Sequence, residues 1–265
     1  MKMKLFRLFV FYIVLSCWIP RMASAEVVNM PDEALAAVVR NRLGLAPDAP
    51  ITRQTLQRLD HLTAPSGTGS PLLIKDLTGL EHATRLQTLN LYFHEIHDLR
   101  PLAGLTQLQN LYLRYNQISD VGPLKDLTQL RNLDLYETQI SDVTPLSGLT
   151  QLETLSLTKT QISDITPFSG LTQLETLYLG VNQISDITPL KDLTQLETLN
   201  LNSNQISDIT PLKDLTQLEI LYLNNNQISD VGPLKDLTQL EILYLDNNQI
   251  SDVTPLSGLT QLKNL

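Results

Sequence analysis

The amino-acid sequence predicts an α/β fold of the solenoid type, in which short structural repeats stack to form one continuous core. A leucine recurs every 22 residues from Leu105 to Leu259, and a fixed period of 20 to 50 residues is typical of solenoids. Each unit is close to LTQLETLYLxxNQISDITPLKD, and residues 117–130 recur unchanged at 227–240. Because a single unit of this size cannot bury its own leucines, it must stack on its neighbours.

Each repeat is predicted to contain a short strand, a turn and a short 3₁₀ or extended segment. Leu111 and Leu113 alternate with a period of two, which places the apolar side chains of a strand on one face. Asp120 and Pro123 then favour a turn, because aspartate bonds to nearby backbone and proline fixes φ. Leu127 returns the chain to the core at the start of the next unit.

An asparagine follows the strand in five of the repeats, at Asn116, Asn182, Asn204, Asn226 and Asn248. At this point the chain leaves the strand and would bury backbone groups without partners. An amide carries both donors and an acceptor, so a stacked ladder of asparagines can satisfy those groups. His94, Thr138 and Thr160 take the same position in other repeats. Threonine offers only a hydroxyl, so we expect the ladder to be weakest in the N-terminal half.

Residues 26–62 are predicted to form a helical N-terminal cap over the open end of the first repeat, as solenoids require for solubility. Apolar residues recur at helical spacing from Leu35 to Leu43, after a first turn that contains Pro31–Glu33 and before a stop at Gly44. Thr52 is suited to cap a second short helix. Residues 63–73 are interpreted as an exposed loop, and residues 74–265 as the repeats, the last of them truncated.

Residues 1–25 are predicted to be a secretory signal peptide. Three basic residues lead into the apolar run Leu8–Ile19, and the small residues Ala23 and Ala25 mark a cleavage site that would leave Glu26 first. The apolar run has 12 residues, whereas a membrane-spanning helix needs about 20, so no membrane span is expected. A lipobox-like sequence that ends at Cys17 leaves a lipid anchor as the alternative.

Charge and cysteine content exclude several classes of function. The chain has 19 basic and 28 acidic residues, a net charge of −9, and four of the basic residues belong to the predicted signal peptide. This acidity disfavours binding to nucleic acid or to anionic membrane surfaces. Cys17 is the only cysteine, so the mature chain would have no thiol for a disulfide, a metal cluster or thiol catalysis.

The 22-residue unit with its turn at Ser185–Leu190 resembles the repeats of bacterial internalins and of the related SDS22-like leucine-rich-repeat class. The segments Pro31–Asp32, Leu35–Ala36 and Leu43–Gly44, with residues 52–62, are similar to the helical cap that precedes internalin repeats. The resemblance covers about residues 28–265. It implies a curved, right-handed solenoid with a parallel sheet on its concave face, exported and used for protein recognition or adhesion.

The C-terminal end departs from that pattern. Internalins typically continue into an immunoglobulin-like module and often a surface-attachment signal, whereas this sequence stops at Leu265, within a predicted strand. We therefore expect either a fragment of a longer protein or an end that is covered by dimerisation.

No catalytic motif is found in the sequence, which has no glycine-rich phosphate loop, nucleophile elbow or HExxH motif, and neither an enzyme activity nor a cofactor is expected. The strongest metal candidate is the segment His94–Asp98, with two imidazoles and two carboxylates. His94 takes the ladder position and Ile96 a core position, so we interpret the segment as a variant first repeat and expect no metal.

Outward-facing positions of stacked strands form columns whose members lie about 4.7 to 4.9 Å apart. Aromatic and charged residues gather in these columns at the N-terminal end, at Tyr92, Phe93, Tyr112, Arg114, Tyr115, Asp134, Tyr136, Glu137 and Lys159. Tyrosine and arginine are enriched at binding hot spots, although exposed tyrosine also simply favours strands. We expect the Arg114 guanidinium to lie against the Tyr92 or the Tyr136 ring, and Glu137 to pair with Lys159.

Two classes of function fit these features of a secreted or cell-surface protein. The first is a recognition or adhesion module that binds a protein partner through its concave face. The alternative is a carbohydrate-binding or structural cell-envelope protein, because tyrosine beside asparagine and aspartate can stack on sugars and bond to them.

Overall fold

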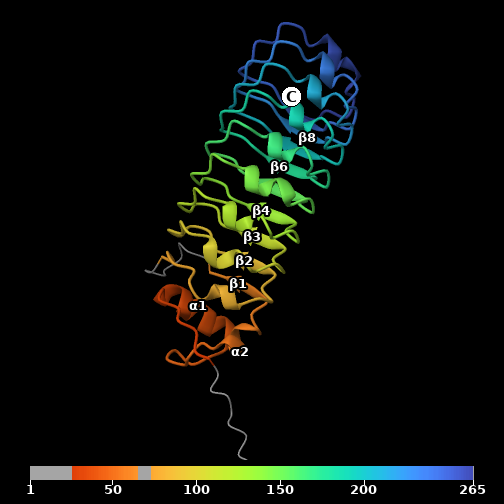
Figure 1. The fold of residues 1–265 in the computed structure, drawn as a ribbon. Coiled ribbons are helices and arrows are strands. Elements are labelled where there is room, and N and C mark those ends of the chain that lie inside the picture. The colour runs from red at the N-terminus through yellow and green to blue at the C-terminus, as the bar shows by residue number, and fades with distance from the viewer. Residues whose placement is uncertain (1–25, 65–72, 265) are drawn as a thin grey trace, which may run out of the picture.

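The chain is an elongated solenoid in a computed structural model that describes residues 26–64 and 73–264 (Figure 1). Within these residues nine parallel strands form one sheet in sequence order. The strands are β1 His61–Thr63, β2 Thr88–Asn90, β3 Asn110–Tyr112, β4 Asn132–Asp134, β5 Thr154–Ser156, β6 Thr176–Tyr178, β7 Thr198–Asn200, β8 Ile220–Tyr222 and β9 Ile242–Tyr244. The predicted repeat architecture is therefore confirmed, and the strands from β2 to β9 begin every 22 residues.

The strand register places equivalent residues of successive repeats side by side. Leu89 pairs with Leu111, which pairs with Leu133, so each apolar position becomes a column along the solenoid. The strand of this repeat ends at Tyr112, one residue before Leu113, yet Leu111 and Leu113 are both fully buried. Burial of such columns stabilises the solenoid by roughly 25 cal/mol for each Å² of apolar surface removed from water.

A short 3₁₀ helix follows each strand, and successive 3₁₀ helices pack against one another. They are η1 Leu80–His82, η2 Arg100–Leu102, η3 Gly122–Leu124, η4 Thr144–Gly148, η5 Thr166–Phe168, η6 Thr188–Leu190, η7 Thr210–Leu212, η8 Gly232–Leu234 and η9 Thr254–Gly258. In η6, Asp186 accepts a hydrogen bond from the Thr188 backbone N–H at 2.8 Å, and a proline lies in the first turn. Aspartate and proline therefore have the turn roles that the sequence predicts.

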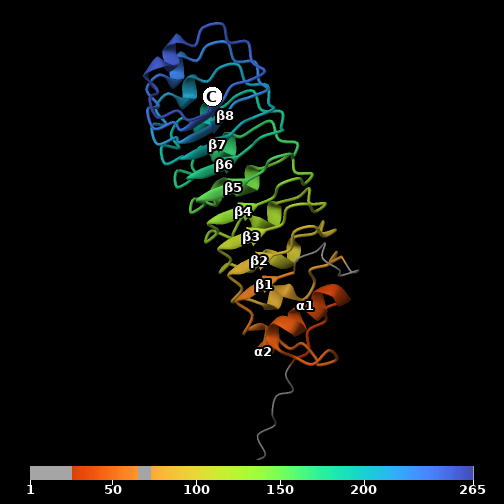
Figure 2. The same ribbon diagram turned by 180° about the vertical axis from the view of Figure 1, so that it is seen from behind.

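Two helices form the N-terminal cap, as predicted, and lie at the opposite end of the solenoid from the last repeats (Figure 2). Helix α1, Glu33–Leu43, begins after Asp32, whose carboxylate accepts from the Leu35 N–H at 2.9 Å, and ends at Gly44 with a φ of 66°. Only a residue that tolerates the left-handed region suits that final position. Helix α2, Arg53–Leu56, is capped by Thr52.

Asp32 also joins the cap to the first repeat. Its second carboxylate oxygen accepts from the backbone N–H of Lys75 at 2.8 Å and of Asp76 at 3.1 Å. Partial burial acts to raise the pKa of Asp32, but the backbone hydrogen bonds, that of Lys75 first, outweigh it and lower the pKa below the ordinary value. One charged side chain thus fixes both the start of α1 and its position against the repeats.

Some predicted segments fall wholly or partly outside the described residues. These are the signal peptide with Cys17, and residues 65–72 of the expected loop. Thr63, which the composition of its segment assigns to that loop, instead lies in β1 and pairs with Asn90. In the last repeat Val253 is 59% exposed, whereas the equivalent Val231 is 1% exposed.

Candidate functional site

The asparagine ladder lies immediately behind the sheet. Asn116 Nδ2 donates to the backbone oxygens of Leu91 and Leu113, each at 2.8 Å, and its Oδ1 accepts from the Ile96 N–H at 2.9 Å. Asn182, Asn204, Asn226 and Asn248 repeat this arrangement in their own units. Each amide therefore links two successive repeats, which is a structural role.

Other residues replace asparagine in three N-terminal repeats and bond differently. The Thr138 hydroxyl donates to Leu135 O at 2.8 Å, within its own repeat, and the Thr160 hydroxyl lies 2.8 Å from both Leu157 O and Asn182 Oδ1. The imidazole of His94 accepts from the Ile74 N–H at 3.3 Å and has its other nitrogen 3.1 Å from Ala64 O. Threonine thus supplies fewer bonds between repeats than asparagine does.

These contacts also explain the chemistry of the His94–Asp98 segment. Burial lowers the pKa of His94, and both ring nitrogens are engaged with backbone. Among the described residues no group of three or more His, Cys, Asp or Glu side chains could hold a metal ion.

The predicted binding residues lie at the ends of neighbouring strands and just after them, and we call the nine residues named in the sequence prediction the N-terminal patch. The Phe93 and Tyr115 rings stack with centroids 4.0 Å apart and an interplanar angle of 11°. Tyr92 meets the Phe93 ring edge-on at 5.7 Å, and Tyr115 meets Tyr136 edge-on at 5.1 Å. Four aromatic rings from three repeats therefore form one continuous cluster.

Charged groups lie within and beside these rings. The Arg114 guanidinium carbon lies 5.1 Å from the Tyr92 ring centroid, one of the two placements expected for it. The other candidate ring, Tyr136, instead contacts Tyr115, and a hydrogen bond with the Tyr115 hydroxyl raises the pKa of Tyr136. Lys159 Nζ lies 2.6 Å from Glu137 Oε1, the expected pair, and this bond raises the lysine pKa.

Tyr112 and Asp134 close the patch along the strand ends. The Asp134 carboxylate accepts a hydrogen bond from the Tyr136 backbone N–H at 3.0 Å. It therefore fixes the turn after β4 in addition to adding charge, and Tyr112 lies half-buried at the end of β3. The structure places all nine residues at the ends of four successive strands, β2 to β5, and in the segments that follow them.

One backbone feature of the patch was not anticipated from the sequence. The third residue after each of the strands β2 to β9 has a φ between +53° and +61°, in the left-handed region, at Phe93, Tyr115, Glu137, Lys159, Val181, Ser203, Asn225 and Asn247. Asparagine tolerates this region better than aromatic or β-branched residues do. The asparagines at the last two positions were the available signal, since they mark a place where the chain favours a left-handed residue.

The C-terminal repeats present a different surface. Tyr222 and Tyr244 stack at 5.3 Å with an interplanar angle of 5°. Beside them Asn247 Nδ2 donates to Asn225 Oδ1 at 2.8 Å and to Asp246 Oδ2 at 3.1 Å. This surface combines one aromatic pair with amides and a carboxylate.

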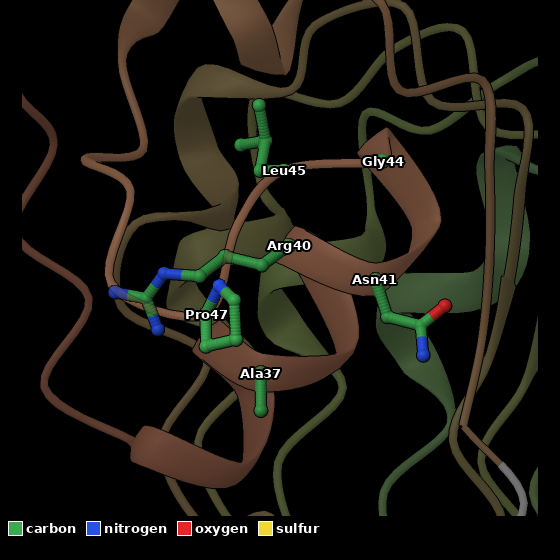
Figure 3. A pocket seen from close by; sticks show the side chains of 6 residues that line it. All are labelled: Ala37, Arg40, Asn41, Gly44, Leu45 and Pro47. Carbon is green, nitrogen blue, oxygen red and sulfur yellow. The ribbon is translucent and has the colours of Figure 1, made fainter.

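A separate pocket lies on the cap, between α1 and the segment that follows it (Figure 3). Its lining consists of Ala37, Arg40, Asn41, Gly44, Leu45 and Pro47. Arg40 Nε donates to the Ala49 backbone oxygen at 3.0 Å, so the arginine has a structural role in the cap. The lining has no paired acid, base or nucleophile that would indicate catalysis.

Comparisons with known proteins agree with this architecture. The family described as "Leucine Rich repeats (2 copies)" matches in overlapping windows that together run from residue 84 to residue 258. No curated protein sequence matches the chain significantly.

Two solved internalins of Listeria monocytogenes are similar to the chain. Internalin C2 is 39% identical, with a TM-score of 0.78, over 81% of this chain and 93% of that one. Internalin InlF is 34% identical, with a TM-score of 0.57, over 88% of this chain and 81% of that one. The plant peptide hormone receptor RGFR1, solved in complex with RGF2, is 22% identical, with a TM-score of 0.71, over 81% of this chain and 37% of that one, a likeness of fold alone.

Proposed function

Because the chain belongs to the internalin-type family of leucine-rich-repeat proteins, we propose that it is an exported, non-catalytic protein that binds a protein partner through the concave sheet face of its N-terminal repeats. The observation that carries this proposal is the Phe93–Tyr115 stack, at 4.0 Å, in which both residues have a left-handed φ. Phe93 is 43% exposed there, so its ring is accessible to a partner.

The backbone conformation supports a functional role for these side chains. A left-handed φ costs an L-amino acid about 1 to 2 kcal/mol, and asparagine reduces that cost, as at Asn225 and Asn247. Phe93 and Tyr115 retain bulky rings at the equivalent position, where they stabilise neither a buried core nor the ladder. Because the left-handed conformation recurs from Phe93 to Asn247, the bulky rings that occupy it, and not the backbone itself, distinguish the N-terminal repeats.

The composition of the patch supports a protein partner. Large, partly exposed rings offer apolar area at low entropic cost, and Arg114 with the Glu137–Lys159 pair adds charges of both signs. Centres of this kind, surrounded by polar residues, are typical of interfaces between proteins.

Export is proposed from residues 1–25, with a secreted or cell-surface location; acylation at Cys17 is the alternative route to the surface. Within residues 26–64 and 73–264, no helix has both the length and the apolar character that a membrane crossing requires. N-terminal sequencing of the exported protein separates the two routes, because cleavage after Ala25 leaves Glu26 first and a lipoprotein begins at a blocked Cys17.

The test of partner binding begins with parallel screens of the purified protein against extracellular proteins and against a glycan array. For each ligand found, we expect Tyr136→Ala to weaken binding by at least about 1 kcal/mol. The matched control is Asn224→Ala, in the same column of the C-terminal repeats, which should bind unchanged. A ligand that binds both folded variants equally well would place the site elsewhere.

Carbohydrate binding in a cell-envelope protein is the second candidate function. It is favoured by the Tyr222–Tyr244 stack beside Asn225, Asp246 and Asn247, because aromatic faces and amides suit the apolar and hydroxyl surfaces of a sugar. A glycan hit that is lost in Tyr244→Ala and kept in Tyr136→Ala would favour this function over the first.

A further inference from the structure

We propose that Arg114 recognises a carboxylate, specifically an aspartate or glutamate side chain in the bound protein segment, with an aromatic or aliphatic residue next to it. The inference rests on the proposed function and names the chemistry of the partner. It follows from the pairing of charges on the sheet face, from the position of the guanidinium and from the aromatic rings near it.

Arg114 differs from the other cations that flank the strands. Lys159 is paired with Glu137, Arg131 with Glu153 and Lys263 with Glu241. Arg114 forms no ion pair with any residue that the structure describes, and its side chain is exposed. An exposed guanidinium outside any internal ion pair can bind an external anion without first breaking such a pair.

The Tyr92 ring holds this guanidinium in place. With the guanidinium carbon 5.1 Å from the ring centroid, the contact lies within the range of a cation–π interaction. A cation–π contact uses none of the guanidinium N–H groups as hydrogen-bond donors to a carboxylate, so these donors stay available. The planar edge of the guanidinium matches the two oxygens of a carboxylate, which it binds through two parallel hydrogen bonds.

Apolar rings continue from the Tyr92 ring that the Arg114 guanidinium contacts. The Phe93 ring centroid lies 5.7 Å from that of Tyr92, and the Phe93 ring stacks on the Tyr115 ring at 4.0 Å. The Phe93–Tyr115 stack is therefore separated from the guanidinium by one ring. A partner that covers both features needs an apolar side chain next to its acid.

The overall charge cannot be the source of this preference. The chain carries a net charge of −9, which repels an acidic partner at long range. Selectivity for a carboxylate must therefore arise from short-range contact with Arg114. This distinguishes the proposal from general electrostatic attraction.

The experiment uses displayed random twelve-residue peptides, selected on the purified full chain, followed by synthesis of the enriched peptides. We expect enrichment of an acid next to an aromatic or aliphatic residue. Changing that acid to its amide should weaken binding to the wild type at least about tenfold, as for lost charge-assisted hydrogen bonds. With Arg114→Ala the same change should have less than about a twofold effect. Arg114→Lys, which keeps the charge but loses the planar edge, should bind more weakly than the wild type.

Asn224→Ala is the control for this series, Tyr115→Ala reports whether a peptide uses the patch, and thermal melts confirm that each variant is folded. Peptides that need Tyr115 but carry no acid, or whose acid acts equally with Arg114→Ala, would overturn this inference and leave the proposed function standing. Peptides that are insensitive to Tyr115→Ala would overturn both. Failure to select any peptide would also overturn the inference. This holds whether or not a heparin-derived hexasaccharide binds to the protein through Arg114.

Discussion

Replacing Val181 by asparagine should stabilise the protein. Val181 has a φ of 56° and is 44% exposed. A β-branched side chain is a genuine outlier in the left-handed region, whereas asparagine occupies it several times more often than most residues. The substitution changes one side chain on the surface and leaves the buried leucine columns intact.

The expected gain is about 1 kcal/mol in the free energy of unfolding. A left-handed conformation costs an ordinary residue about 1 to 2 kcal/mol, and asparagine recovers part of that cost through local hydrogen bonding. Because nearly half of the valine surface is already in water, the apolar burial that is lost offsets only a fraction of this gain. Ser203 and Asn225 carry polar side chains at the equivalent position of the next two repeats, so the turn accommodates them.

Urea unfolding followed by circular dichroism measures the effect. Long repeat arrays can lose two-state cooperativity, so the midpoint and the slope of the transition should be compared together. The matched control is Thr158→Asn, on the sheet face one repeat earlier and outside the left-handed positions. We expect the control to change stability by less than about 0.5 kcal/mol.

An unchanged or lower midpoint for Val181→Asn, at an unchanged slope, would refute the strain argument. It would also remove the support that left-handed backbone gives to the proposed site. If Val181→Asn gained stability but lost partner binding, the site would extend from Lys159 to Val181. The two residues lie in adjacent repeats, where the Lys159 N–H donates to the Gly180 oxygen at 2.9 Å.

Two further predictions concern stability. Asn204→Ala should lower the free energy of unfolding in urea by roughly 1 to 3 kcal/mol, because it leaves buried backbone groups of two repeats unsatisfied. Thr160→Ala should lower it by less. Equal losses would contradict the stabilising role of the asparagine ladder. Hydrogen bonds from threonine hydroxyls, and next from the backbone of the same threonines, lower the pKa of Asp142, Asp164, Asp186, Asp208 and Asp252. Since these carboxylates have a lower pKa in the folded state, their contribution to the free energy of unfolding is complete above the unfolded pKa of about 3.9 and is lost as pH falls through the folded values. The urea midpoint should therefore hold from pH 7 to about pH 5 and fall below about pH 4. A midpoint unchanged at about pH 3 would contradict this.

The repeat fold could be predicted because its determinants are local and periodic. The leucine pattern of one repeat specifies the sheet and the core, and its asparagine position specifies the ladder, because every repeat stacks on the next in the same way. The cap could also be predicted, because Asp32, Thr52 and Gly44 are capping residues with short-range partners. The contact of Asp32 with Lys75 and Asp76 spans more than 40 residues and carries no periodic signal.

The candidate site was predictable only as a set of columns. Sequence spacing indicates which residues lie side by side, but it does not determine rotamers. The sequence allowed the Arg114 guanidinium to lie against either Tyr92 or Tyr136, and in the structure the Tyr136 ring instead contacts Tyr115. The left-handed turn depends on backbone angles that leucine periodicity does not encode, although asparagine at positions 225 and 247 is consistent with it.

The two departures from the regular repeat lie in the repeats of β2 to β6, which include the N-terminal patch. Threonine replaces asparagine at 138 and 160, where fewer hydrogen bonds link the repeats, and bulky side chains occupy the left-handed positions from Phe93 to Val181. The C-terminal repeats have asparagine in both places at 225–226 and 247–248. In a solenoid each repeat contacts only its neighbours, so these costs remain local. A regular, well-satisfied C-terminal half can therefore support an N-terminal half whose side chains are suited to contact with a partner.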